Sequence, residues 1–470
     1  MVVGDISTGT EVAVVGGGPG GYVAAIRAAQ LGLDAMLIER DALGGVCLNH
    51  GCIPSKALLS AAGVAHEAAN AGEMGVYADP EVDVAETVAW KDGVVSRLTG
   101  GVEKLCKANG VELVSGTARF AGERRLRVQR EDGGETVEFE HAVVATGSRP
   151  VEVPGFDFDD EAVLDSADAL GLTALPDRLV VVGAGYVGLE LSTLFAKLGV
   201  DVTVVEMLEG ALPGYADDLT RPVVESARDL GVEFHFGVGA EGYRETDDGV
   251  VVAAGEGEAR VEVPADRVLV AVGREPVTDT LDLEAAGLST TDEGFLATDE
   301  EARTDNPHVF AVGDVAGEPM LAHKASREGK VAAEVAAGEP AALDYRTVPA
   351  AVFTDPEVGT VGLTADAAER EGYDPVVGQF PFRASGRALT TGHEEGFVRV
   401  VADEGSGLVL GGQVVGPEAS ELLAELGLAI EMGATLEDVA GTVHTHPTLS
   451  EAVVEAAENA MGRAIHTLNR

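Results

Sequence analysis

The sequence is poor in lysine, cysteine and aromatic residues. Only seven of its 470 residues are lysine, three are cysteine and 4% are aromatic. No apolar run reaches the ~18 residues that a membrane span requires. Acidic residues outnumber basic ones 80 to 32, and the resulting net charge of −48 repels DNA and RNA. We therefore expect a protein that spans no membrane and binds no nucleic acid.

The acidic residues are scattered along the chain rather than gathered in one tail. Such a charge destabilises the compact state by self-repulsion at low salt. At ~1 M salt the Debye length is about 3 Å, and the repulsion is screened. We therefore expect a halophilic source, with an ordinary acidic bacterial protein as the alternative.

The first residues suggest a cellular location. Residues 11–21 already have the pattern of a first strand and turn, so we expect no signal peptide. This leaves a cytoplasmic, reducing compartment, where a cysteine pair is more often catalytic than structural.

Two of the three cysteines, Cys47 and Cys52, lie in the run G-G-V-C-L-N-H-G-C-I-P-S-K at positions 44–56. On an ideal helix, residues five apart rise about 7.5 Å, whereas a disulfide needs Cα atoms within roughly 6.8 Å. A bridge would therefore distort its turn and be labile. The alternatives are two buried small residues or half of a metal site, but zinc usually needs a second ligand pair. We expect a redox-active pair, no metal, and a packed thiol at Cys106.

Two stretches carry the pattern of a βαβ unit. Apolar runs at 12–15 and 179–182 are each followed by a glycine-rich turn, a helical stretch and a second strand that ends at Glu39 or Glu206. A duplication on this scale indicates two nucleotide-binding domains in one chain.

Each turn has the spacing G-x-G-x-x-G. The first glycine makes the tight turn, the second lets the backbone approach a pyrophosphate, and the third lets helix and strand pack closely. The acid that follows 18 residues after the last glycine is expected to bind a ribose hydroxyl. Because no arginine occurs at 207–210, Glu206 favours NAD over NADP. The glycines are Gly16, Gly18 and Gly21 in the first turn and Gly183, Gly185 and Gly188 in the second.

Further motifs follow in a fixed order along nearly the whole chain. They are A-T-G-S at 145–148, V-G-R-E-P at 272–276, V-F-A-V-G-D at 309–314, M-L-A-H at 320–323 and H-T-H-P-T-L-S-E at 444–451. Together with the glycine turns and the cysteine run, these motifs resemble the flavin-dependent pyridine nucleotide–disulfide oxidoreductases, and among them the enzymes that oxidise dihydrolipoamide.

The resemblance implies an α/β fold with two Rossmann-like dinucleotide-binding domains plus a C-terminal α+β dimerisation domain. The expected divisions are an FAD-binding domain at 1–150, an NAD-binding domain at 151–274, a central segment at 275–345 that returns to the FAD domain, and an interface domain at 346–470.

The resemblance also implies the cofactor contacts. Lys56 is expected close to the flavin N5 and paired with Glu190, and Asp314 is expected on the ribityl chain. For FAD the expected residues are Gly16, Gly18, Gly21, Glu39, Lys56, Ala118, Thr146, Gly147, Ser148, Asp314, Met320, Leu321, Ala322 and His323. For NAD they are Gly183, Gly185, Gly188, Glu190, Glu206 and Gly273.

His446 and Glu451 are the expected acid–base pair. A dithiol must lose a proton before it attacks a disulfide, and a histidine can take that proton near neutral pH. Pro447 is expected to keep His446 out of helical geometry and to begin the next helix, on which Glu451 could orient the imidazole. Taken alone, the two residues could be a capping histidine beside a surface glutamate. His444 lacks a following proline and is expected to be structural.

The resemblance implies that Cys47 is the interchange thiol and that Cys52 faces the flavin. It also implies a homodimer in which His446 and Glu451 come from the neighbouring subunit. The expected reaction is oxidation of dihydrolipoamide, a small dithiol, with reduction of NAD. A lipoyl-bearing acyltransferase or carrier domain is the expected partner, within a 2-oxoacid dehydrogenase complex.

Several alternatives share parts of this pattern. Glutathione-type reductases need arginines after Glu206 to bind NADP, and this chain has none at 207–210. Mercuric reductases usually carry a C-terminal cysteine pair, which is also missing here. A flavin transhydrogenase would not need both Cys47 and Cys52. A docking subunit of a multienzyme assembly is an alternative of another class. His50 replaces a more usual small apolar residue in the cysteine run, and we expect it to have a modest electrostatic effect.

Overall fold

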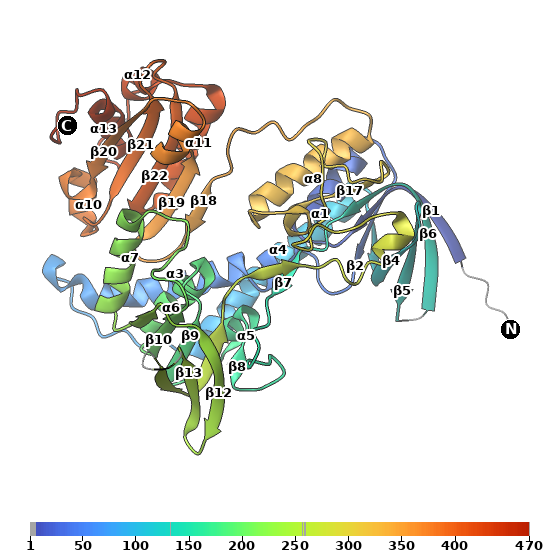
Figure 1. The fold of residues 1–470 in the computed structure, drawn as a ribbon, viewed down its shortest axis with the longest axis horizontal. Helices are drawn as coiled ribbons and strands as arrows, with labels where there is room; N and C mark the ends of the chain where they lie inside the picture. The colour runs from blue at the N-terminus through green and yellow to red at the C-terminus, as the bar shows by residue number, and fades with distance from the viewer. Residues whose placement is uncertain (1–5, 132, 256, 258–259, 470) are drawn as a thin grey trace. The chain divides into compact units, whose positions relative to one another are not determined.

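The structure is a computed structural model that describes residues 6–131, 133–255, 257 and 260–469 (Figure 1). The chain divides into two compact units. The first comprises Met1–Val153, Leu164–Leu175 and Val272–Asp344, and the second comprises Pro154–Val163, Pro176–Ala271 and Tyr345–Arg470. The expected division into four functional segments remains a prediction.

Parallel strands form the centre of the first unit's sheet. They run in the order β3-β2-β1-β6, and β17 pairs with β6 in parallel. Val12, Ala13 and Val14 are completely buried, which explains why β1 appears in the sequence as a continuous apolar run. The parallel strands are β1 (Ile6–Val15), β2 (Ala35–Glu39), β3 (Glu112–Ser115), β6 (Gly133–Val144) and β17 (Val309–Ala311). The antiparallel members are β4 (Thr117–Gly122) and β5 (Arg125–Arg130), and a separate ribbon pairs β7 (Ser148–Pro150) with β16 (Arg274–Pro276).

Two helices of the first unit, α1 and α8, pack against each other closely (Figure 1). A Cβ atom at Gly329 of α8 would lie only 2.3 Å from the carbonyl oxygen of Gly20 in α1, so glycine is required at this crossing. The α-helices of the first unit are α1 (Pro19–Gln30), α2 (Gly45–Asn49), α3 (Cys52–Asn70), α4 (Val84–Ala108), α5 (Ser166–Gly171) and α8 (Ala322–Ala336). Its 3-10 helices are η1 (Ala71–Met74), η3 (Leu283–Ala286) and η4 (Gly313–Ala316).

The second unit contains a second parallel sheet with the order β11-β10-β9-β15-β8. Beside it lies an antiparallel sheet of β12, β13 and β14. The strands are β8 (Val163–Leu164), β9 (Arg178–Val182), β10 (Asp201–Glu206), β11 (Glu233–Phe236), β12 (Ala240–Thr246), β13 (Gly249–Ala254), β14 (Val261–Ala265) and β15 (Arg267–Val270). The helices in this part are α6 (Tyr186–Lys197) and α7 (Asp217–Asp229).

The C-terminal part of the second unit is an antiparallel sheet with the order β18-β19-β22-β21-β20. A Cβ atom at Gly378 of β20 would lie 2.0 Å from the carbonyl oxygen of Ala456, so α13 lies directly on this strand. The strands are β18 (Ala350–Val352), β19 (Glu357–Gly362), β20 (Pro375–Pro381), β21 (Phe397–Asp403) and β22 (Val409–Gly416). The helices are α9 (Ala365–Arg370), η5 (Phe382–Ala384), α10 (Gly386–Thr391), α11 (Ala419–Met432), α12 (Leu436–Gly441) and α13 (Glu451–Ala460).

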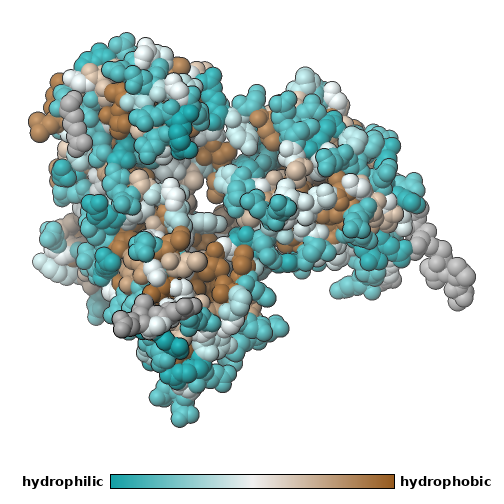
Figure 2. All heavy atoms as spheres, in the orientation of Figure 1, coloured by the Kyte–Doolittle hydropathy of each residue, from teal (hydrophilic) through white to brown (hydrophobic). Residues whose placement is uncertain are grey.

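These elements confirm both predicted βαβ units, with strands that end at Glu39 and Glu206. They also confirm the α+β pattern of the last segment, which combines an antiparallel sheet with helices such as α11 at Ala419–Met432. On the face drawn in Figure 2, hydrophilic residues cover most of the surface, as the excess of acidic side chains requires.

Candidate active site

Cys47 and Cys52 stand on different helices because the helix breaks between them. Cys47 belongs to α2, which ends before His50, and Cys52 is the first residue of α3. Their side chains are hydrogen-bonded to each other and are not joined by a disulfide. Because the helix is interrupted, the axial rise of about 7.5 Å between residues five apart on one helix does not separate the two cysteines. That a disulfide would distort this turn remains a prediction.

The surroundings of Cys47 raise the pKa of its thiol. The hydrogen bond with Cys52 raises the pKa of Cys47, and burial and the charge of Cys52 act in the same direction. Lys56 lowers this pKa and Asp314 raises it, so both charged groups lie near the cysteine pair. Because a raised pKa lowers the fraction of thiolate at Cys47, a nearby base would assist chemistry at this sulfur.

The other two residues singled out around the cysteines differ in burial. Cys106 is completely buried on α4, and burial raises the pKa of its thiol to about 11, which confirms a packed thiol. His50 is exposed and caps α2 by donating its backbone N–H to the carbonyl of Val46 at 2.8 Å. Its electrostatic effect on the pair remains a prediction.

The first glycine turn leaves no room for side chains at two of its three glycines. Gly16 has a φ of +103°, and a Cβ there would lie 2.3 Å from the carbonyl oxygen of Ala145. A Cβ at Gly21 would lie 1.8 Å from the carbonyl oxygen of Gly16. At Gly18, which precedes α1, the nearest atom is 3.9 Å away. The backbone at the helix N-terminus is therefore open to a bound pyrophosphate.

The second turn repeats this geometry. Gly183 has a φ of +104°, and a Cβ at Gly188 would lie 2.1 Å from the carbonyl oxygen of Gly183. Gly185, which precedes α6, has nothing within 4 Å of an added Cβ. The two turns thus present the same cradle.

Glu39 and Glu206 hold their carboxylates in the same way. One oxygen of each accepts the N–H of the second residue of its glycine turn, at 2.6 Å and 2.7 Å. The other oxygen accepts the N–H two residues further along the chain, at 2.8 Å in both cases. Because a carboxylate oxygen can accept more than one bond, each remains able to accept a ribose hydroxyl.

Ser148 and Asp314 are brought together although 166 residues separate them. Ser148 donates its hydroxyl to Asp314 Oδ2 at 2.5 Å, and Arg274 donates to both the hydroxyl and the carbonyl of Ser148 at 2.8 and 2.7 Å. Glu328 accepts the N–H of Gly313 at 2.7 Å and so holds the loop that carries Asp314. The roles of Arg274 and Glu328 are not apparent from the sequence, because they depend on tertiary contacts.

The remaining residues expected to contact FAD lie at strand ends and at a helix start. Thr146 donates its hydroxyl to the carbonyl of Val277 at 2.6 Å, and Gly147 has a φ of +71°. Ala118 is buried on β4, in the core. Residues 320–323 lead into the first turn of α8.

Two of the residues expected to contact NAD have protein partners. Glu190 is buried on α6 and accepts the backbone N–H of Phe353 at 2.9 Å. Gly273 has a φ of +143°, and its carbonyl accepts the N–H of Val151 at 3.1 Å in the first unit. The expected pairing of Glu190 with Lys56 remains a prediction.

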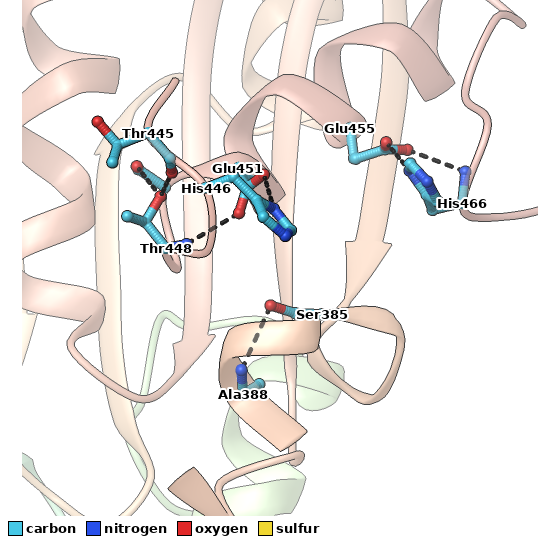
Figure 3. A network of polar contacts seen from close by, with 9 residues as sticks. Ser385, Ala388, Thr445, His446, Thr448, Glu451, Glu455 and His466 are labelled. Carbon is cyan, nitrogen blue, oxygen red and sulfur yellow. Dashed lines mark hydrogen bonds and ion pairs between the residues drawn. The ribbon is translucent and has the colours of Figure 1, made fainter. Parts of the chain in front are cut away.

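His446 and Glu451 are directly paired. His446 Nδ1 lies 2.9 Å from Glu451 Oε1, and the other carboxylate oxygen accepts the N–H of Thr448 at 2.8 Å (Figure 3). Burial raises the pKa of Glu451, but the bonds from Thr448 and His446 outweigh it and leave this pKa below its usual value. The histidine side chain is 78% exposed, so an oriented imidazole faces outward from a fixed carboxylate.

The expectation that Pro447 begins the next helix is wrong. The His446–Pro447 peptide is cis, and α13 begins only at Glu451. Thr448 closes the intervening turn by donating its hydroxyl to the carbonyl of Thr445 at 2.7 Å and its N–H to Glu451. Glu451 is therefore the first residue of α13. Its bonds to Thr448 and His446 hold its carboxylate against the preceding turn.

Two other histidine–carboxylate pairs lie in the C-terminal part. His444, expected to be structural, is mostly buried and pairs through Nε2 with Glu425 at 2.6 Å. His466 pairs with Glu455 at 2.5 Å, and this bond raises the pKa of His466 (Figure 3). No spacing in the sequence indicates these pairs, because their members are 19 and 11 residues apart.

Within the described part of the chain, no group of three or more His, Cys, Asp or Glu side chains could hold a metal ion. In the same residues, no helix is both long enough and apolar enough to cross a bilayer.

Known protein families and relatives match the chain along nearly its whole length. Residues 10–329 match the family described as pyridine nucleotide-disulphide oxidoreductase, and residues 348–457 match the dimerisation domain of that family. Dihydrolipoyl dehydrogenases of Halobacterium salinarum and Haloferax volcanii are 70% and 65% identical to the chain, over the full length of both partners. The dihydrolipoyl dehydrogenase of Geobacillus stearothermophilus is 48% identical, also over the full length of both partners.

Solved structures agree with these matches. LpdA from Mycobacterium tuberculosis has a TM-score of 0.90 and 30% identity, and the match covers 96% of this chain and 99% of that one. The HOCl-induced flavoprotein disulfide reductase RclA from Escherichia coli has a TM-score of 0.85 and 26% identity, with 95% and 99% covered. The halophilic relatives fit the expected salt adaptation, and the matches confirm the fold class and an FAD- and NAD-linked oxidoreductase. The chain therefore belongs to the pyridine nucleotide-disulphide oxidoreductases, and its full-length relatives are dihydrolipoyl dehydrogenases.

Proposed function

We propose that this chain oxidises dihydrolipoamide to lipoamide and reduces NAD, with FAD between the two. The observation that carries the proposal is the hydrogen-bonded pair Cys47–Cys52, which lies in the same compact unit as a glycine cradle for a dinucleotide. The curated relatives that match over the full length bear the name of this activity. A scaffold that only docks would not need a paired dithiol, a cradle and an oriented histidine.

The residues of the first unit fit FAD. Gly16 and Gly21 are held where only glycine fits, Gly18 is open to a pyrophosphate, and Glu39 is fixed where it can accept a ribose hydroxyl. Bound there, the flavin supplies two-electron chemistry between a dithiol and a nicotinamide. We assign to its site Gly16, Gly18, Gly21, Glu39, Lys56, Ala118, Thr146, Gly147, Ser148, Asp314, Met320, Leu321, Ala322 and His323.

The second cradle fits NAD. Glu206 is buried, with both carboxylate oxygens bonded to backbone N–H groups, so it cannot move aside for a 2′-phosphate. The lack of arginine at 207–210 removes the partner that such a phosphate would need. We assign to this site Gly183, Gly185, Gly188, Glu190, Glu206 and Gly273. With these assignments, segments 1–150 and 275–345 bind FAD, 151–274 binds NAD, and 346–470 forms the subunit interface.

The cysteine pair performs a thiol–disulfide exchange. A substrate thiolate attacks Cys47 in the oxidised pair, which breaks the Cys47–Cys52 bond, forms a mixed disulfide with Cys47 and releases Cys52 as thiolate. The second substrate thiol, deprotonated, then attacks the substrate sulfur of the mixed disulfide. Lipoamide leaves with its own disulfide, and Cys47 is released. The substrate has lost two electrons and the cysteine pair has gained them.

His446 acts as the base for these steps. Its Nδ1 is held by Glu451, so the outward nitrogen Nε2 takes the proton from a substrate thiol and returns one to Cys47. Because the chain carries a dimerisation domain, it assembles as a homodimer. We assign His446 and Glu451 to the active site that contains the cysteine pair of the neighbouring subunit.

The natural substrate is the lipoyl group of an acyltransferase or carrier domain of a 2-oxoacid dehydrogenase complex. Such a partner would present its dithiol at the end of a long lysine side chain. A cytoplasmic location fits a catalytic rather than structural role for the cysteine pair.

Anaerobic titration of the purified flavoprotein with dihydrolipoamide in high salt tests the proposal. We expect a long-wavelength thiolate–flavin charge-transfer band, together with NAD reduction. Cys52→Ser should lose the band and turnover, whereas Cys106→Ser, which removes the packed thiol outside the pair, should keep both. Absence of the band together with turnover on glutathione or mercury would move the assignment to another disulfide reductase.

A further inference from the structure

A cluster of basic side chains lies in the first unit, away from the glycine turn. It comprises His141 on β6, His308 directly before β17, and Arg303. The imidazole rings of His141 and His308 are 5.9 Å apart between centroids, and His141 packs 5.8 Å from the ring of Phe310. Arg303 places its guanidinium carbon 4.9 Å from the same Phe310 ring. In a chain of net charge −48, such a gathering of basic groups is unexpected.

Both histidines leave a buried ring nitrogen without a partner. The Nδ1 atoms of His141 and His308 are shielded from solvent, and neither makes a hydrogen bond within the described part of the chain. Buried polar atoms are nearly always hydrogen-bonded, because an unmade bond costs free energy. Two such atoms in adjacent rings point to a ligand that supplies the missing interactions.

The charges around His141 decide the sign of that ligand. Burial, His308, Arg303 and Arg124 all lower the pKa of His141, and Glu140 acts against them. Glu301 is bonded to Arg303 at 2.9 Å and offsets part of this positive charge. A metal cation would add to the positive charge that, together with burial, lowers the pKa of His141, whereas an anion would offset that charge.

We propose that His141, His308 and Arg303 form a binding site for a small inorganic anion such as chloride. The site lies level with Val12 of β1, which pairs with His141, and His308 directly precedes β17, whereas Gly16 follows Val15 at the carboxyl end of β1. It is therefore separate from the cradle assigned to FAD. The high salt that screens the chain's own repulsion also supplies the anion.

The site should respond to pH in a definite direction. A protonated imidazole donates from both ring nitrogens, whereas the neutral ring donates from one. Anion binding therefore favours protonated His141. Because the pKa of His141 is lowered, the affinity should rise as the pH falls below the ordinary histidine value of ~6.5. Stabilisation by the anion follows the same trend, because a ligand that binds only the folded state raises its stability.

Crystals of the flavoprotein soaked in bromide test the position, since bromide replaces chloride and scatters anomalously. We expect an anomalous peak between the two imidazoles. In solution, the melting temperature in potassium chloride should exceed that in potassium gluconate of equal ionic strength, by more at pH 6 than at pH 8. A parallel series in potassium phosphate distinguishes a halide site from an oxyanion site.

His141→Phe and His308→Asn should each abolish the peak and the pH-dependent difference between chloride and gluconate. His393→Phe, at an exposed histidine in the second unit, should leave both unchanged. The bromide soak uses the unaltered chain, so its outcome does not depend on whether the variants fold. The proposal fails if no peak appears, if a peak appears without any chloride-specific stabilisation in solution, or if Zn²⁺ rather than bromide occupies the position.

Discussion

Lys324 and Glu328 form an ion pair at 2.8 Å in which both side chains are almost completely buried. Glu328 also accepts the N–H of Gly313, and Lys324 donates to the carbonyl of Gly317 at 3.0 Å. The pair therefore ties α8 to both ends of η4, the short helix that carries Asp314. The ion pair matters because of where it lies: through it, α8 supports the segment that carries Asp314, the proposed ribityl contact.

Glu328→Gln should weaken FAD retention and stability together. Removal of one partner from a buried ion pair leaves the other charge uncompensated, at a cost of roughly 3–5 kcal/mol. The fraction of FAD that remains after gel filtration and the melting temperature measure the two effects. Glu334→Gln on the same helix is the control, because its pair with Arg27 is partly exposed and should contribute about 0–1 kcal/mol. Equal effects of the two variants would contradict this role for Glu328.

Glu451→Gln should lower kcat for dihydrolipoamide about 10- to 1000-fold, because His446 would lose the charged group that orients it. Glu455→Gln, one turn further along α13, removes the carboxylate of the pair with His466 and should have a much smaller effect. Steady-state kinetics with saturating NAD separate the two variants, and a comparable loss in both would indicate a general effect on the helix.

The pH dependence of Glu451 has a defined sign. Its pKa is lowered in the folded protein, so its bonds with Thr448 and His446 stabilise the fold above the ordinary glutamate pKa of ~4.3 and are lost as the pH falls through the lower, folded value. We therefore expect Glu451 to remain ionised from pH 5 to 8. The infrared difference spectrum between the unaltered chain and Glu451→Gln isolates the carboxylate band of Glu451. This band should persist from pH 5 to 8, and its disappearance near pH 6 would contradict the prediction.

Glu206→Ala should reduce the preference for NAD over NADP at least tenfold, mainly through a higher KM for NAD. The carboxylate is the group that would accept the ribose hydroxyls, and its removal also takes away the repulsion of a 2′-phosphate. Glu209→Ala is the matched control, since Glu209 is an exposed acid three residues away. An unchanged ratio of kcat/KM values for the two cofactors would exclude Glu206 from the site.

Salt should stabilise the fold strongly. With a net charge of −48, self-repulsion is large in dilute buffer and is screened at molar salt. Circular dichroism melts across a potassium chloride series should show a midpoint that rises steadily from 0.1 to 3 M. A fold that is equally stable in dilute buffer would show that the surface charge is tolerated without salt.

The sequence by itself determined the features that are local along the chain. Strand and helix positions follow from the apolar periodicity, and glycine is required at Gly16, Gly21 and Gly188 by a positive φ or a close backbone approach within a few residues. The pairing of Cys47 with Cys52 is of the same kind, because only four residues lie between them. The family resemblance suggested what these residues do, whereas their local geometry follows from the sequence itself.

Only the tertiary structure decided contacts between distant segments. Ser148 meets Asp314, and Arg274 meets Ser148, although more than 120 residues separate each pair. The buried Glu328 and the adjacent imidazoles of His141 and His308 likewise depend on how strands and helices pack. The expected helix start at Pro447 is not formed, because the Thr448 N–H bonds to Glu451 and holds the intervening residues in a turn. Local backbone preferences act within a few residues, whereas hydrogen bonds, burial and charge pairing are set by which segments the fold brings together.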